Sequence, residues 1–185
     1  MFFGEKLLFK MIRRLEAESI YLRALEPEDL EFVYQIENDL KLWEVSNTQT
    51  PYSRFLIRQY LENAHQDIYE AKQLRLVICD KKTDEVYGLI DIFDYDPKNA
   101  RAGIGIVIQR DTNRMKGIGS QALKIVIDYA YQHLLLQQIY ANIAADNTSS
   151  KKLFHKFGFA EVGVKKKWNR VGDTYKDEVM YQLIF

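Results

Sequence analysis

The chain has 185 residues, of which 47% are hydrophobic and 28% charged, values typical of one soluble globular domain with a sizeable core. Lysine and arginine number 26, as do aspartate and glutamate, so the formal net charge is +0 and the overall basic charge of a nucleic-acid-binding protein is absent. One cysteine and three widely spaced histidines exclude an internal disulfide and predict no metal site.

We expect a cytoplasmic protein with no membrane partner. The lone Cys79 suits a reducing compartment, and no apolar run approaches transmembrane length. The opening MFFGEKLLFK is too short in its apolar part and too charged for a signal peptide. Because a second methionine stands at Met11, residues 1–18 are interpreted as an N-terminal extension and lead-in, followed by one domain over residues 19–185.

The first half of this domain predicts a strand, two helices and then strands. Residues 19–24 alternate in the manner of a strand, and Pro27 opens a helix whose first turn carries Glu28 and Asp29. Residues 38–53 are interpreted as a loop and residues 55–71 as a second helix. Residues 74–79 and 86–95 predict strands, and the polar turns after them indicate an antiparallel meander.

Residues 102–127, AGIGIVIQRDTNRMKGIGSQALKIVI, predict a buried strand at 104–108, a loop, and a helix from residue 120. The loop carries Arg114, Lys116, Gly117 and Gly119. It suits a phosphate group, because a helix N-terminus offers unpaired N–H groups and glycine lets the backbone approach closely. Neither GxGxxG nor the P-loop fits these residues, and two glycines alone also suit an ordinary turn.

The second half predicts a strand, a helix and two more strands. Residues 138–144 alternate as a strand, and Asn147 is positioned to cap a helix that ends at Gly158. Residues 160–164 and 174–185 predict strands, which a basic and aromatic segment joins.

Two segments resemble the GCN5-related N-acetyltransferases (GNATs). Residues 114–119 match R-x-x-G-x-G, and residues 147–159 match N-x-x-S…L…K-x-G-F at the proper separation. The branches that the chain resembles most are the ribosomal-protein and spermidine N-acetyltransferases. The resemblance implies a single-domain α/β (α+β) GNAT fold, with a mixed, mostly antiparallel sheet of about seven strands, a splayed parallel pair and about four flanking helices.

The resemblance also implies an acetyl-CoA-dependent N-acetyltransferase, in which a primary amine of a small molecule such as a polyamine, or of a protein N-terminus, attacks the thioester directly. The strands 104–108 and 139–144 would then splay, with a bulge near Gly105. The residues implied to bind acetyl-CoA are Ile106, Val107, Ile108, Arg114, Lys116, Gly117, Ile118, Gly119, Ser120, Asn147 and Phe154. For Asn147, simple helix capping is the alternative.

Two departures from the family affect the catalytic prediction. Many relatives carry a tyrosine acid where this chain has Phe154, and many of the ribosomal-protein type carry an acid where it has Gly103. Ser150 is therefore the candidate acid, whereas His155, its helix neighbour, is interpreted as a solvated residue. A non-catalytic acyl-CoA-binding module of the same fold is the alternative function.

Acidic and aromatic residues that could receive an amine are Glu37, Trp43, Asp91 and Tyr175, although each acid alone could be an ordinary solvated residue. The basic run at residues 165–170 is interpreted as an exposed hairpin tip. We expect a small-molecule amine or a peptide N-terminus as partner and no nucleic acid, and a homodimer is left open.

Overall fold

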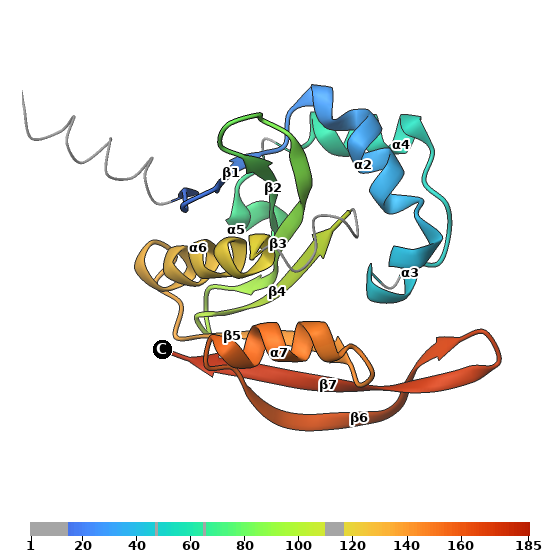
Figure 1. The fold of residues 1–185 in the computed structure, drawn as a ribbon, viewed down its shortest axis with the longest axis vertical. Helices are drawn as coiled ribbons and strands as arrows, with labels where there is room; N and C mark the ends of the chain where they lie inside the picture. The colour runs from blue at the N-terminus through green and yellow to red at the C-terminus, as the bar shows by residue number, and fades with distance from the viewer. Residues whose placement is uncertain (1–14, 47, 65, 110–116) are drawn as a thin grey trace, which may run out of the picture.

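A computed structural model describes residues 15–46, 48–64, 66–109 and 117–185. Within these residues, seven strands form one sheet in the order β1-β2-β3-β4-β5-β7-β6 (Figure 1). All neighbours are antiparallel except β4 and β5, which confirms the predicted mixed sheet with one parallel pair. The strands are β1 (Ile20–Ala24), β2 (Leu74–Asp80), β3 (Val86–Asp96), β4 (Arg101–Ile108), β5 (Gln138–Ala144), β6 (Ala160–Val171) and β7 (Thr174–Ile184).

Helices cover both faces of the sheet. They are α2 (Leu30–Glu37), α3 (Leu40–Ser46), α4 (Arg54–Glu62), α5 (Ile68–Ala71), α6 (Ile118–Gln132) and α7 (Thr148–Lys156), with the 3-10 turn η2 (Pro27–Asp29) before α2. In Figure 1, α6 and α7 lie in front of the sheet, and α2, α3 and α4 lie together at the upper right. No helix among the described residues is long and apolar enough to cross a membrane.

The two faces of β2 show why the chain folds into layers. Leu76 and Ile78 point into the main core beneath α6, whereas Val77 and Cys79 point to the other face. Successive side chains of a strand alternate between faces, so a continuous apolar run serves both layers. The second face packs on Ile36 of α2 and Leu42 of α3, and α4 packs on α2 in turn.

Three element predictions were wrong. Residues 38–53 contain the helix α3 rather than only a loop, and residues 55–71 form two helices, α4 and α5, rather than one. The break is stabilised by Asp67, whose carboxylate caps α5 by accepting from the amides of Tyr69 and Glu70. The basic segment after residue 164 belongs to β6, which continues to Val171 with irregular pairing to β7.

The expected bulge near Gly105 and Ile106 was also wrong. β4 pairs with β3 in continuous register from Gly103 to Ile108. The irregularity lies between Phe93 and Asp96 of β3, where Asp94 has a positive φ of 49°.

Candidate active site

The parallel strands β4 and β5 separate soon after they meet. They pair from Arg101 with Gln138 to Gly103 with Tyr140, and no further pairing joins them in the described chain. We call the gap between residues 104–108 of β4 and 141–144 of β5 the fork. β4 stays paired with β3 to its end, so its other edge faces the fork.

The hydrogen-bonding pattern fixes which amide groups face the fork. Hydrogen-bonded pairs recur every second residue in an antiparallel ladder, and the Gln109 N–H donates to the Tyr87 carbonyl at 2.9 Å. The amides of Ile106 and Ile108 therefore point away from β3 into the fork, as the resemblance requires. Val107 differs, because its amide faces β3 and its side chain packs beside the core beneath α2.

The N-terminus of α6 closes one end of the fork. Gly117 is its N-cap with φ 80°, a left-handed conformation that glycine adopts without strain. A Cβ at Gly119 would lie 3.5 Å from Leu153 of α7 and 3.7 Å from Ile106, so α6, α7 and β4 meet at this glycine. The first-turn N–H groups of such a helix lack intrahelical partners and favour anions.

The cations predicted for this helix terminus are only partly described. Arg114 and Lys116 lie outside the described residues. Ile118 is buried, and Ser120 lies one residue after Gly119 in the first turn of α6. The Lys156 ammonium of α7 donates to the Ser120 hydroxyl at 3.4 Å, which brings one lysine to the helix terminus that the sequence analysis did not assign.

Helix α7 carries the candidate acid. The Asn147 side chain caps the helix by accepting from the Ser150 amide at 3.1 Å, which supports the capping alternative for its oxygen. Ser150 is half-buried, one turn before Phe154 on the same helix face. Phe154 is only 2% exposed and packs edge-to-face on Phe159, so its ring belongs to the core rather than to the lining of the fork.

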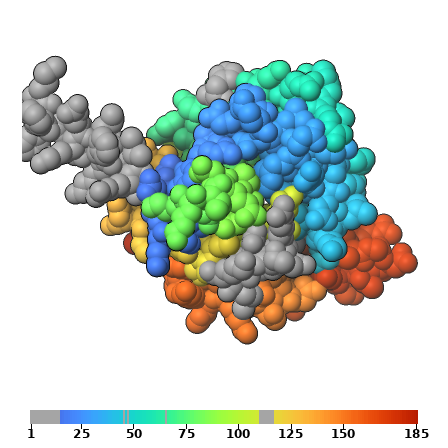
Figure 2. Space-filling model, turned by 45° about the horizontal axis from the view of Figure 1, so that its top comes forward, coloured from blue at the N-terminus to red at the C-terminus, as the bar shows by residue number. Residues whose placement is uncertain are grey.

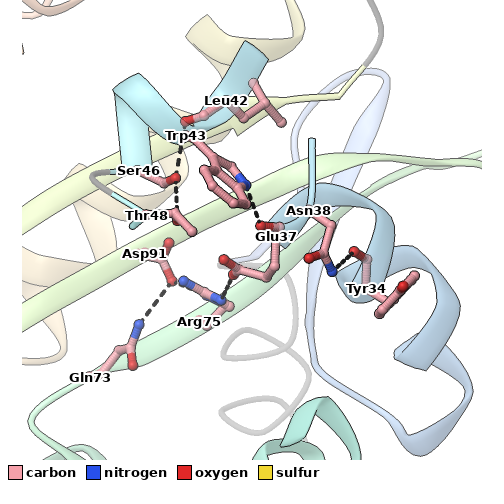
Figure 3. A network of polar contacts seen from close by, with 10 residues as sticks. All are labelled: Tyr34, Glu37, Asn38, Leu42, Trp43, Ser46, Thr48, Gln73, Arg75 and Asp91. Carbon is pink, nitrogen blue, oxygen red and sulfur yellow. Dashed lines mark hydrogen bonds and ion pairs between the residues drawn. The ribbon is translucent and has the colours of Figure 1, made fainter. Parts of the chain in front are cut away.

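Two predicted amine-binding acids share one arginine (Figure 3). The Arg75 guanidinium donates to Asp91 through Nε and to Glu37 through Nη1, each at 2.7 Å. Gln73 adds a longer bond of 3.4 Å to the same Asp91 oxygen. Burial opposes the charge of Arg75, but Asp91 and then Glu37 hold its pKa above the ordinary value. Glu37 and Asp91 are therefore partners in a charged network, and neither is the ordinary solvated acid of the alternative interpretation.

The other two predicted substrate residues lie apart from each other. The Trp43 indole N–H donates to the Glu37 carbonyl at 2.9 Å, so Trp43 lies against the charged network (Figure 3). Tyr175 lies near the tip of the β6–β7 hairpin and is 57% exposed. Its neighbour Lys176 bridges Glu44 of α3 and Asp146 before α7, at 2.5 and 2.7 Å. Figure 2 shows this hairpin, in red, beside α3 in light blue.

A polar cavity of about 760 Å³ opens on the second face beside the base of the fork. Tyr140 lines it and donates to Asp94 at 3.0 Å; burial and then this bond raise the pKa of Tyr140 to about 12. The Phe93 ring covers Gly103, where a Cβ would lie 2.2 Å from the ring. The position at which many relatives carry an acid is therefore filled by an aromatic ring.

Sequence reasoning missed Arg75 and Tyr140. Arg75 offered a signal, because a charged residue inside the apolar strand LRLVIC needs buried partners of opposite charge. Tyr140 offered none, since its partner Asp94 is far away in the sequence.

These parts combine into a site with definite chemistry. A strand edge that faces a gap can pair with the amides of an extended ligand, and a helix N-terminus can hold its phosphates. A network with two carboxylates and one guanidinium keeps a surplus negative charge, which suits an ammonium group.

Comparisons with known proteins agree with this geometry. The model of the Acetyltransferase (GNAT) domain matches residues 19–160. Spermidine N(1)-acetyltransferase of Escherichia coli is 29% identical over 151 residues, covering 80% of this chain and 76% of the relative. Putative ribosomal N-acetyltransferase YdaF of Bacillus subtilis is 28% identical over 179 residues, covering 90% and 92%.

Among solved structures, spermidine N-acetyltransferase from Vibrio cholerae in complex with CoA and spermine superposes with a TM-score of 0.79. The two are 25% identical, over 89% of this chain and 95% of that one. Because the family model spans most of the sheet, the fork and α7, the chain belongs to the GNAT acetyltransferase family and is an acetyl-CoA-dependent N-acetyltransferase.

Proposed function

We propose that the chain transfers the acetyl group of acetyl-CoA to a small primary amine that is bound beside Asp91 and attacks the thioester at the fork. The observation that carries the proposal is the early separation of β4 from β5 next to the N-terminus of α6. The names of the spermidine acetyltransferases support a small aliphatic amine as acceptor. A peptide N-terminus is the second candidate acceptor, supported by the likeness to YdaF.

The cofactor would lie along the edge of β4. The amides of Ile106 and Ile108 face the fork and suit the amides of pantetheine. The N–H groups of the first turn of α6, together with Arg114 and Lys116, suit the pyrophosphate. Phe154 would support α7 from the core without touching the cofactor, and Asn147 would use its amide nitrogen, since its oxygen caps the helix.

The acceptor would bind on the second face. Asp91 pairs with Gly105 of β4 in register, and Gly105 places no side chain between that carboxylate and the edge of β4. An ammonium held by Asp91 loses a proton to water, and the neutral nitrogen bonds to the carbonyl carbon. The nitrogen then gives up a second proton to water as the carbon–sulfur bond breaks and the amide forms. The departing thiolate takes a proton from Ser150 or water, and positioning of the two reactants supplies much of the acceleration.

Calorimetric titration with CoA tests the cofactor site. Arg114→Ala combined with Gly119→Asp should weaken CoA binding by about 100-fold, because the double variant loses one cation and places a carboxylate against the pyrophosphate. The matched control Arg58→Ala with Gly163→Asp makes the same charge changes at an exposed arginine of α4 and an open glycine of β6. Equal affinity in the two double variants would refute the site.

A thiol-release assay tests transfer. Wild-type protein should release CoA from acetyl-CoA with small primary amines. Binding of CoA without release across polyamines, monoamines and peptides with free N-termini would favour the non-catalytic module.

A further inference from the structure

We propose that Arg75 sets the acceptor specificity of this site, by pairing with both Glu37 and Asp91 and leaving one surplus negative charge. The site then takes an amine with a single ammonium in preference to a polyamine. This inference rests on the proposed function, which places the amine beside Asp91.

The charge count is fixed by burial and geometry. Arg75 and Asp91 are each 19% exposed and Glu37 is 14% exposed, and both hydrogen bonds of the guanidinium are 2.7 Å long. An arginine in such a site stays charged, because both carboxylates favour its protonated form. Two carboxylates and one guanidinium leave a net charge of one negative unit for the ligand to balance.

The network still has room for one donor. Asp91 uses the same oxygen for Arg75 and Gln73, and its other oxygen has no hydrogen-bond partner among the described residues (Figure 3). Glu37 likewise uses one oxygen for Arg75. A single ammonium, with its three donors, matches this arrangement.

On the side of the network that faces α2 and α4, no surplus carboxylate is available among the described residues to pair with a second ammonium. A cavity of about 470 Å³ lies there, and Glu37 and Arg75 are the charged members among its described lining residues. The other polar members are neutral: Ser46, Thr48, Tyr52, Gln59, Tyr60, Asn63 and Gln73. Placing an ammonium in this cavity would remove it from water without a counter-charge.

In the cavity beside the base of the fork, the charged groups already have polar partners among the described residues. Its acids are Asp94 and Asp96, and its bases are Arg101 and Lys165. Asp96 pairs with Arg101 at 3.3 Å, and Lys165 pairs with Glu178. Asp94 accepts from the Tyr140 hydroxyl at 3.0 Å, so a polyamine would have to share Asp94 with Tyr140, or break an ion pair, in order to place its second ammonium.

Matched amines test the inference. The probes are n-butylamine and putrescine, which is the same carbon chain with a second terminal amine, and the measurement is calorimetric affinity in the presence of CoA. Wild type should bind n-butylamine at least as tightly as putrescine. Arg75→Met should shift the affinity ratio by about tenfold or more toward putrescine, because two unpaired carboxylates would bind a diammonium ion in place of the guanidinium.

Two further variants isolate the effect of charge. Arg75→Met combined with Glu37→Gln restores one negative charge and should return the ratio toward that of wild type. Arg54→Met removes a more exposed arginine, which pairs with Glu31, and should leave the ratio unchanged. If Arg75→Met does not fold, Arg75→Gln carries the comparison, since its amide still donates to one carboxylate.

Each outcome decides the inference. Wild type that binds putrescine more tightly than n-butylamine, or a folded Arg75 variant with an unchanged ratio, overturns it. No detectable amine binding overturns it as well. If the ratios follow the prediction but acetyl-CoA releases no thiol with either amine, the proposed reaction fails and the charge rule stands. If both amines are acetylated but the affinity ratio is the same in wild type and the Arg75 variant, the inference about charge fails and the proposed reaction stands.

Discussion

At the scale of single residues, Phe154 decides which group can act as an acid. Its ring packs on Phe159 at a centroid distance of 5.0 Å and has no proton to give. Ser150 lies one turn earlier on the same face, half-buried, and its hydroxyl makes no hydrogen bond to another described residue. In the proposed reaction, the proton for a departing thiolate would come from this hydroxyl or from water, and a thiolate needs little help because its free pKa is about 8.5.

Ser150→Ala should lower kcat by roughly tenfold or more and leave the affinity for CoA nearly unchanged, because only the acid is lost. Ser149→Ala makes the same change at an exposed neighbour and is the matched control, and His155→Ala should likewise have little effect. Steady-state thiol release measures all three variants. Full kcat in Ser150→Ala would assign the proton to water, and a large loss in His155→Ala would contradict the role given to Ser150.

The site could be predicted from the sequence where its residues are close in the chain. The strand before the loop, the helix that begins after Gly117 and the cap at Asn147 follow from local pattern, and the described residues contain all three. The partners of Asp91 and Glu37 could not be predicted, because Arg75 reaches them across different elements. The same holds for Phe93, whose ring fills the space over Gly103 only after the β3 and β4 strands pair.

At the scale of elements, α6 and α7 were predicted well, whereas α3 and the break between α4 and α5 were missed. α6 and α7 show a clear apolar face, whereas α3 has seven residues and fixes itself to the core mainly through Leu42. The helix predicted over residues 55–71 broke because the Asp67 side chain caps a new start, a local hydrogen bond that competes with apolar periodicity. The irregular pairing of β6 with β7 could not be predicted either, because alternation of polar and apolar residues assumes a regular strand.

The close contact between β3 and β4 at Gly88 predicts how a substitution there changes the free energy of unfolding. A Cβ at Gly88 would lie 2.0 Å from the Val107 carbonyl oxygen, a backbone atom that cannot move aside cheaply. Gly88→Ala should therefore lower the free energy of unfolding by about 3 kcal/mol. Gly163→Ala, at a strand glycine with nothing within 4 Å of its Cβ, should change it by less than about 0.5 kcal/mol. Urea denaturation compares the two variants. Equal free energies of unfolding would contradict the prediction, because they would mean that β3 and β4 accommodate the added Cβ without strain.

At the scale of the whole molecule, the acceptor side that we propose would be assembled from two parts far apart in the chain. The helices α2 and α3 bring Glu37 and Trp43, and the C-terminal hairpin brings Lys176, which contacts Glu44 of α3 and Asp146. The hydrogen bonds to Asp146 and then Glu44 raise the pKa of Lys176. These ion pairs are partly exposed, so they should orient α3 more than they stabilise the fold.

Lys176→Met should therefore change the free energy of unfolding by less than about 1 kcal/mol, yet raise KM for the amine several-fold without changing KM for acetyl-CoA. The physical reason is that α3 loses its tie to the hairpin while Leu42 still anchors it in the core. Added salt should raise the amine KM of wild type toward that of the variant, because exposed ion pairs are screened. Lys166→Met is the matched control, since Lys166 pairs with Asp177 of its own hairpin. An unchanged amine KM in Lys176→Met would show that packing alone positions α3.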